Sequence, residues 1–518
     1  INTTTTGKIT LDSKNAVGIF AQNNGTANTR SVVKNTKIIN VSKEGSAGIL
    51  GEKSTITNSG AGTDGIVLTA NKTVGIIGKN ASEVSNTGRI ETKTATPSGS
   101  SEGLVGISLN ASTGTNSGDI ILGTAHSTGM NGVASSTVIN AKNITGNKEN
   151  VVGMAVNAST ATNTDKGTIT LNGLTSTGMF GAARSTVTNA GKIETKTAVP
   201  TGTATGLVGI AVNASTGTNT GKIILGTKFS TGMFGAAGST ITNEGEITGT
   251  QENSVGMAGD ASTVTNKETI NLAGKNSTGL FGKNNSTLTN ETNATITLGE
   301  EESVGIYSDA NNALAINKGI INAVKKNSAG MLGKKGNIEN TGTITTADEK
   351  SATMYTENAN ATNKATLNAN GQKSAGIYAK VNEAAGNINI VGANIANATI
   401  TITGTQSAGM LGLMDKTTGA NSSLKLENSG KIDIKNKESV GMMVTNNSAT
   451  IAKDKVIATN KTGGVINLES TTATDDKNIG ILANEKATGI NEGTIQVKTL
   501  ESVGMLGQAA SEVINRNT

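Results

Sequence analysis

One short phrase recurs along the whole chain and constrains its fold more than any other feature. The phrase is typically Ser-x-Gly followed by Ile, Met or Leu. It occurs nineteen times, and in one of these copies Thr353 replaces the Gly. The mean spacing is 27 residues; most steps are 23 to 26, and the longer ones reach 39. A regular period of this size is typical of a protein built from stacked repeats.

Two further signatures follow each copy of the phrase. One is a Ser-Thr-x-Thr-Asn run, as at 185–189, and the other is Gly-x-Ile-x-Leu, as at 167–171. Short alternating runs closed by Gly or Asn indicate strands and turns, three of each per repeat. The sequence therefore predicts an all-β fold, a right-handed parallel β-helix with three-strand coils of about 23 residues and roughly 19 coils. We expect residues 1–518 to form a single elongated rod of roughly 90 Å at about 4.8 Å per coil.

Two columns of residues support this stacking. The residue after the repeat Gly is Ile, Met or Leu in every copy and is expected to face inward, with a Val, Ala, Thr or Ile two positions earlier packed beside it. An Asn recurs at the end of the second strand. Stacked amides can hydrogen-bond from coil to coil, so we interpret this column as a structural ladder that includes Asn189, Asn219, Asn243, Asn266 and Asn290.

The aromatic residues share one slot. Seven of the eight stand directly after the core Ile, Met or Leu, among them Tyr307, Tyr355 and Tyr378. Strict strand alternation would place them on the outer surface, where sugar rings could stack on them. The favoured interpretation is that alternation lapses there and the rings pack into a corner of the core, because a long exposed apolar column is an aggregation hazard.

The chain also carries a duplication and a set of insertions. Residues 92–195 and 195–298 are partly duplicated four-coil blocks, and each has a Pro-containing loop, at 92–102 and 195–205. Coils within 376–480 carry long inserts, which are placed at 379–397, 413–424 and 445–476. Loops on a rigid scaffold often carry binding functions, but long loops also cost little free energy. Both interpretations of the inserts stay open.

Composition argues against an enzyme. The chain has no Cys and a single His, His126, which aligns with Phe229 across the duplication. Triads and Cys/His zinc sites are therefore not expected, and the Asp residues are scattered rather than paired for acid–base catalysis. We expect no catalytic residue, no metal and no cofactor. The net charge of +5 over 518 residues argues against nucleic acid as a partner.

The motifs Ser-x-Gly-[Ile/Met]-[Phe/Tyr]-Gly and Ser-Thr-x-Thr-Asn-x-Gly-x-Ile, at this spacing, resemble the passenger domains of type V autotransporters. The Asn-, Lys- and Thr-rich, Cys-free version is most similar to the large fusobacterial outer-membrane autotransporter adhesins. The resemblance implies an extracellular passenger on a bacterial surface, attached to the outer membrane through a C-terminal β-barrel that would lie outside this chain. We expect the chain to be a fragment or processed product of a longer protein, and monomeric.

The resemblance also implies a function. It points to a virulence-associated adhesin that binds host glycans of the galactose or N-acetylgalactosamine type, inhibitory immune receptors, or other bacteria. The candidate ligand-binding residues are Tyr307, Tyr355, Tyr378, Asp415, Lys416, Lys453, Asp454, Lys455, Asp475 and Asp476. A purely structural stalk is the first alternative, a polysaccharide-acting β-helix enzyme the second, and an ice-binding β-helix a distant third.

Overall fold

The structure is a computed structural model that describes residues 7–23, 30–196, 206–310, 313–383, 387–416, 419, 421–469 and 476–516. The chain divides into two compact units, unit 1 (Ile1–Ala258) and unit 2 (Gly259–Thr518). The described residues form 57 strands, nineteen at each of three positions. This arrangement confirms the predicted all-β parallel β-helix with three-strand coils.

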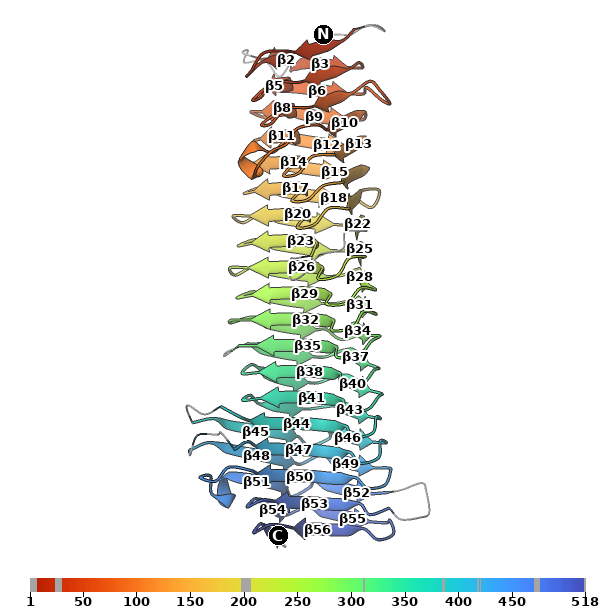
Figure 1. The fold of residues 1–518 in the computed structure, drawn as a ribbon, viewed down its shortest axis with the longest axis vertical. Coiled ribbons are helices and arrows are strands. Elements are labelled where there is room, and N and C mark those ends of the chain that lie inside the picture. The colour runs from red at the N-terminus through yellow and green to blue at the C-terminus, as the bar shows by residue number, and fades with distance from the viewer. Residues whose placement is uncertain are drawn as a thin grey trace. The chain divides into compact units, whose positions relative to one another are not determined.

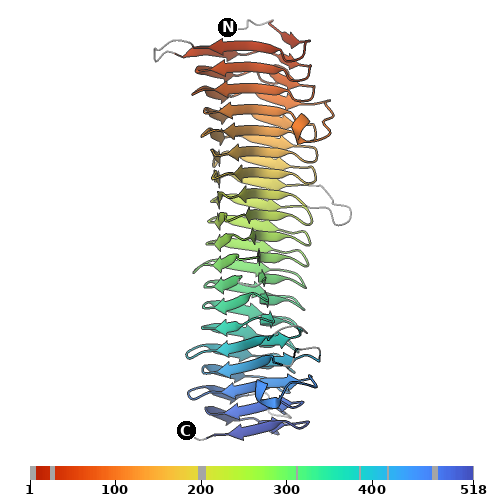
Figure 2. The ribbon, with the colours of Figure 1, turned by 90° about the vertical axis from the view of Figure 1, so that its left-hand side faces the viewer.

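Each coil contributes one strand to each of three sheets, which we call C, A and B in chain order. In unit 2, for example, one coil consists of β44 (Ala375–Val381), β45 (Asn389–Asn394) and β46 (Thr399–Ile402). Within each unit, strands of the same sheet in successive coils pair in parallel, and their arrows point the same way (Figures 1 and 2). Equivalent residues of successive coils therefore lie side by side about 4.8 Å apart.

Sheet C carries the surface that differs most between the units. In unit 1 it contains β2 (Val17–Gln22), β5 (Ala47–Glu52), β8 (Val74–Lys79), β11 (Val105–Asn110), β14 (Thr128–Val133), β17 (Val152–Asn157), β20 (Thr177–Ala182), β23 (Val208–Asn213) and β26 (Thr231–Ala236). In unit 2 it contains β32 (Thr278–Lys283), β35 (Val304–Asp309), β38 (Ala329–Lys334), β41 (Ala352–Glu357), β44, β47 (Ala408–Met414), β50 (Val440–Asn446), β53 (Ile479–Asn484) and β56 (Val503–Gly507). The unit boundary falls within β29 (Val255–Asp260).

Sheets A and B are built from shorter strands. In unit 1, sheet A runs from β3 (Ser31–Asn35) to β27 (Thr240–Asn243) and sheet B from β1 (Ile9–Leu11) to β28 (Glu246–Gly249). In unit 2, sheet A runs from β30 (Thr263–Asn266) to β57 (Glu512–Asn515) and sheet B from β31 (Thr269–Leu272) to β55 (Thr494–Val497). Most of these strands have four residues, two facing in and two facing out.

The core is a column of aliphatic side chains that alternation points inward. In β25 (Lys222–Leu225), Ile223 and Leu225 are fully buried, and the residue after the repeat Gly, such as Met233, is fully buried as well. The residue two positions before Met233 does not face inward as predicted. The pairing register of sheet C skips the repeat Gly, so that residue lies on the outer side, half-exposed as in Thr231.

The repeat Gly is required by the close approach of successive coils. A Cβ on Gly376 would lie 2.5 Å from the carbonyl oxygen of Gly409 and 2.5 Å from a methyl group of Ile400. Thr353 is the exception, and its hydroxyl donates a hydrogen bond to the carbonyl oxygen of Gly376.

The described residues contain two helices, both short 3₁₀ turns. The first, η1 (Ser100–Glu102), lies in the predicted loop 92–102 and is the orange helix in Figure 2. The second, η2 (Lys453–Lys455), lies between β50 and β51 (Val456–Asn460). Neither is long and apolar enough to cross a membrane. Most of the second predicted loop, residues 197–205, is outside the described residues.

The long inserts are only partly loops. Strands β44, β47 and β50 have seven residues, where the other sheet C strands of unit 2 have five or six. Residues 445–476 include two complete core strands, β51 and β52 (Val465–Leu468). Alternating apolar residues explain this, since Val456, Ala458 and Ile466 all face the core.

Candidate functional site

Buried asparagines join the coils at the end of sheet A. In unit 1, Asn189 donates its side-chain amide to Asn219 at 2.7 Å, and Asn219 donates to Asn243 at 2.8 Å. In unit 2, Asn266 donates to Asn290 at 2.8 Å. All five are fully buried. The amide is also used within its own coil, since Asn189 donates to the carbonyl oxygen of Gly191 at 3.2 Å. The column is thus a continuous scaffold element within each unit.

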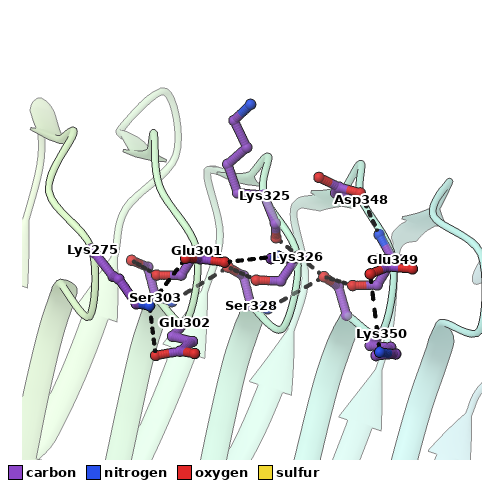
Figure 3. Close-up of polar contacts among 11 residues, drawn as sticks. Lys275, Glu301, Glu302, Ser303, Lys325, Lys326, Ser328, Asp348, Glu349 and Lys350 are labelled. Atoms are coloured by element: carbon purple, nitrogen blue, oxygen red, sulfur yellow. Dashed lines mark hydrogen bonds and ion pairs between the residues drawn. The ribbon is translucent and has the colours of Figure 1, made fainter.

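Charged side chains pair across the turns that precede sheet C. In unit 2, Lys275 lies 3.0 Å and Lys326 3.4 Å from the two carboxylate oxygens of Glu301 (Figure 3). Lys275 and then Lys326 lower the pKa of Glu301. Unit 1 has an equivalent Lys–Glu–Lys set, in which Lys72 and Lys14 hold the pKa of Glu44 at about 2. These pairs are exposed, so they add little stability.

The aromatic column lies outside the core, which corrects the favoured sequence interpretation. Alternation does not lapse after the core residue: in β20, Met179 is buried and Phe180 is 38% exposed. Phe20 is 53% exposed, and Tyr307, Tyr355 and Tyr378 are half-buried on the outer face of sheet C. The rings do not enter a corner because the turn begins only after two more strand residues.

The three candidate tyrosines lie on one face, and two of them touch. The rings of Tyr355 and Tyr378 are 4.9 Å apart at 38°, while Tyr307 stacks edge-on against Phe281 at 5.3 Å. Burial, and then the charge of Asp309, raises the pKa of Tyr307 to about 12. Burial also raises the pKa of Tyr355 and Tyr378. Each ring is therefore partly desolvated, with one face available to solvent.

A groove of about 410 Å³ runs beside this column across four coils of unit 2. We call its parts the wall, the floor and the rim. The wall is formed by Tyr378, Leu411 and Met443, the floor by Ala352, Ala375, Ala408 and Val440, and the rim by Lys350, Lys373, Gln406 and Glu438. The floor is low because Ala352, Ala375 and Ala408 stand where most other coils have Thr, Val or Ile. The arrangement is an apolar trough with one polar edge.

The rim residues have a backbone conformation that disfavours them. Lys350, Lys373, Gln406 and Glu438 all have φ near +55°, which costs roughly 1–2 kcal/mol for a residue other than Gly, Asn or Asp. Asn occupies the same turn position at 276 and 327. Long polar residues also occupy this turn position away from the groove, as Lys72 and Glu302 do. Gln406 donates to Glu438 at 2.8 Å, which orders part of the rim.

The structure brings some of the other candidates to this groove and leaves others away from it. Asp415 follows β47 and lies 3.6 Å from Lys380, two residues beyond Tyr378 on the same face; Lys416 is next to it and exposed. The backbone oxygen of the buried Asp476 accepts a hydrogen bond from Glu438 of the rim. Asp475 lies outside the described residues.

The remaining candidates form a separate exposed cluster. Lys453, Asp454 and Lys455 make up η2, which packs on sheet A, and Lys453 pairs with Glu512 at 2.8 Å. They therefore do not contribute to the groove. In the parts of the chain that the structure covers, no group of three or more His, Cys, Asp or Glu side chains could hold a metal ion.

The groove floor is absent from the sequence predictions, although the sequence carries a signal for it. Four consecutive sheet C strands of unit 2 begin with Ala, at Ala329, Ala352, Ala375 and Ala408. If the first residue of the strand and the residue after the core Ile or Met both face outward, a run of small residues at the first and large residues at the second predicts a trough. The sequence analysis places the small position in the core, where a run of small residues does not predict a trough.

The geometry defines a parallel β-helix with an apolar trough on one outer face, and comparison with known proteins agrees with the fold. The family model of the BigA third pectate lyase-like domain matches residues 195–294 and, again, 257–358. That domain is a β-helix-type domain of a bacterial surface protein. The two overlapping matches are consistent with a repeat. No curated protein matches the chain.

Proposed function

We propose that the chain is a non-enzymatic adhesin domain of a bacterial surface protein, and that it binds a host-cell glycan in the groove of unit 2. The groove itself carries this proposal. Its wall offers the half-buried ring of Tyr378 and two aliphatic side chains, and its rim offers ammonium, amide and carboxylate groups. Sugars present both chemistries, since their C–H faces pack on apolar surface while their hydroxyls need polar partners.

The repeat of the groove supports an extended sugar chain as its ligand. Wall, floor and rim recur at every coil, about 4.8 Å apart, and one pyranose ring of an extended glycan spans about this distance. An extended peptide repeats its side chains on one face every ~6.8 Å, twice the rise per residue of a strand. A glycan can therefore repeat the same contacts from coil to coil, whereas a peptide falls out of step.

Strand addition is not available at this face. Strand β47 is paired with β44 on one side and β50 on the other, so its backbone groups have partners. A ligand must then be held by side chains, and recognition by strand addition needs an unpaired edge. The similarity of residues 195–358 to a surface-protein β-helix supports the location of the domain.

The test is binding of the purified chain to a glycan array and to host cells. Ala375→Leu with Ala408→Leu fills the groove from its floor, and we expect it to weaken binding at least tenfold. Thr231→Leu places the same side chain at the equivalent outer position of unit 1 and serves as the matched control. Binding that survives the double substitution would contradict the groove as the site.

The other functions give different results in the same assays. Binding to purified receptor ectodomains but not to glycans would indicate that the ligand is a protein. No binding to either would leave a structural stalk, and release of reducing sugar would indicate an enzyme. Deletion of residues 445–476 is not a suitable test, because it removes the core strands β51 and β52.

A further inference from the structure

The outer face of unit 1 carries one short phrase three times. Asn-Ala-Ser-Thr occurs at 110–113, 157–160 and 213–216. Each Asn is the last residue of a sheet C strand, in β11, β17 and β23, and all three are exposed. Asn-x-Ser/Thr is the acceptor sequence for sugar attachment to asparagine and is useful only where the side chain reaches the surface.

These asparagines occupy every second coil. At the same register position the strands carry, in the paired order, Lys79, Asn110, Val133, Asn157, Ala182, Asn213 and Ala236, so an apolar residue separates each acceptor from the next. Neighbouring acceptor sites are thus about 9.6 Å apart, two strand spacings. An attached sugar would have the width of two coils to itself.

The turn does not require asparagine at these positions. The phrase Asp260-Ala261-Ser262 forms the same turn, with Ala261 at φ 51° and Ala111 at φ 48°. In the described part of the chain, no hydrogen bond holds the side-chain amides of Asn110, Asn157 or Asn213. The three amides are therefore exposed and have no structural role that explains them.

Asn80 provides an internal contrast. It also begins an Asn-Ala-Ser phrase, but its own φ is 52° and its side-chain amide donates to the carboxylate of Glu52. The phrase beginning at Asn290 is another acceptor sequence, and that side chain is fully buried in the asparagine ladder. The acceptor sequence alone does not show that the side chains of Asn80 and Asn290 are engaged, whereas the structure distinguishes both from Asn110, Asn157 and Asn213.

A small outward residue lies beside each acceptor, and the one beside Asn213 is flanked by two phenyl rings. The outward residue two positions before each Asn is small, Ser108, Ala155 or Ala211. Ala211 pairs with Phe180 on one side and Phe234 on the other. A sugar on Asn213 would lie over Ala211 in a slot bounded by two phenyl rings, against which its C–H groups can pack.

We propose that Asn110, Asn157 and Asn213 are sites of asparagine-linked glycosylation. The Nδ2 atom of the asparagine forms a bond to the anomeric carbon of a sugar activated as its diphosphate ester, supplied with a transferase by the producing cell. The bond from that carbon to the diphosphate oxygen breaks, the diphosphate leaves with the electron pair, and the amide proton passes to a base. The chain contributes the acceptor amide and the slot.

The primary test is peptide mapping by mass spectrometry of the protein isolated from its native cell surface. We expect hexose-type additions on the peptides containing Asn110, Asn157 and Asn213, and none on those containing Asn80 or Asn290. Each of Asn110→Gln, Asn157→Gln and Asn213→Gln should remove one addition. Unmodified peptides at all three positions, or equal occupancy at Asn80, would overturn the proposal.

A second measurement tests the slot separately from the acceptor sequence. Phe180→Ala and Phe234→Ala should lower the melting temperature of the glycosylated protein more than that of the same variants after enzymatic removal of the sugar. Phe20→Ala changes an exposed ring distant in sequence from the three sites and serves as the control. Equal shifts in the glycosylated and deglycosylated proteins would show that the rings do not contact the sugar.

Discussion

The outer faces of sheet C in the two units differ far more than their cores. In unit 2 the position after the core residue is large and apolar in all nine coils, from Phe281 to Leu506. In unit 1 only some coils have a large apolar residue at this position, and the others have Ser108, Asn131, Ala155 and Ala211. Both units nevertheless keep the same inward Ile, Met or Leu and the same asparagine ladder. The scaffold thus leaves outward positions free, so differences there reflect what each surface contacts.

If the scaffolds are equivalent, then the same change in the Gly column should have the same large effect in both units. A Cβ on Gly232 would lie 2.4 Å from the carbonyl oxygen of Gly256, and one on Gly376 lies 2.5 Å from that of Gly409. We expect Gly232→Ala and Gly376→Ala each to cost about 3 kcal/mol, measured by urea denaturation.

The matched control for this prediction is Thr353→Gly. It removes the one side chain that fills the slot and its hydrogen bond to Gly376, so it should cost only about 1 kcal/mol. A large loss for one Gly substitution and none for the other would show that the two cores differ.

The asparagine ladder gives the next largest effect. Asn219→Ala in unit 1 removes one acceptor of the Asn189 amide and the side-chain donor to Oδ1 of Asn243. Asn340→Ala does the same to Asn317 and Asn363 in unit 2. Unsatisfied buried groups of this kind cost about 2–3 kcal/mol. Asn110→Ala, at an exposed asparagine, should change stability by less than about 0.5 kcal/mol. Unequal losses at Asn219 and Asn340 would contradict equivalent ladders.

The fold was predictable because its constraints repeat. The Gly, core and Asn columns recur in nineteen coils, and each coil tests the same strand assignment. An error in the assignment of one coil therefore does not change the predicted fold. The aromatic slot was not predictable in the same way. Alternation from the inward Met179 places Phe180 outside, and the sequence does not show that the strand continues to Ala182 before the turn begins.

The groove depends on the register skip at the repeat Gly, which turns the residue before that Gly outward. Once Ala375 and Tyr378 both face outward, their difference in size makes a trough, but the sequence had placed Ala375 in the core. The candidates Lys453, Asp454 and Lys455 are charged residues of an insert, and they lie on η2 away from the groove. Charge marks a solvated segment, whereas a binding surface needs convergence of several side chains.

A smaller effect would distinguish the two outer faces by function. Tyr378→Ala removes the aromatic part of the groove wall, and we expect it to weaken glycan binding about tenfold, which corresponds to about 1.4 kcal/mol. Phe234→Ala removes a comparable outward ring from unit 1 and should leave binding unchanged. Equal losses of binding on both substitutions would place the ligand site on both faces and remove the contrast between them.

The smallest effect concerns the exposed Lys–Glu–Lys sets, which both units share. Lys72 and Lys14 lower the pKa of Glu44 from 4.5 to about 2, and Lys275 and Lys326 lower that of Glu301. A carboxylate whose pKa is lowered in the folded state stabilises that state above its unfolded pKa, and this contribution is lost as the pH falls through the folded pKa. The difference in melting temperature between the wild type and Glu44→Gln should therefore be largest above pH 4.5 and vanish near pH 2.

The difference in melting temperature between the wild type and Glu301→Gln should change with pH in the same direction. High salt should reduce both differences because the pairs are exposed. A difference that does not change with pH would show that these glutamates stabilise their turns through packing rather than charge.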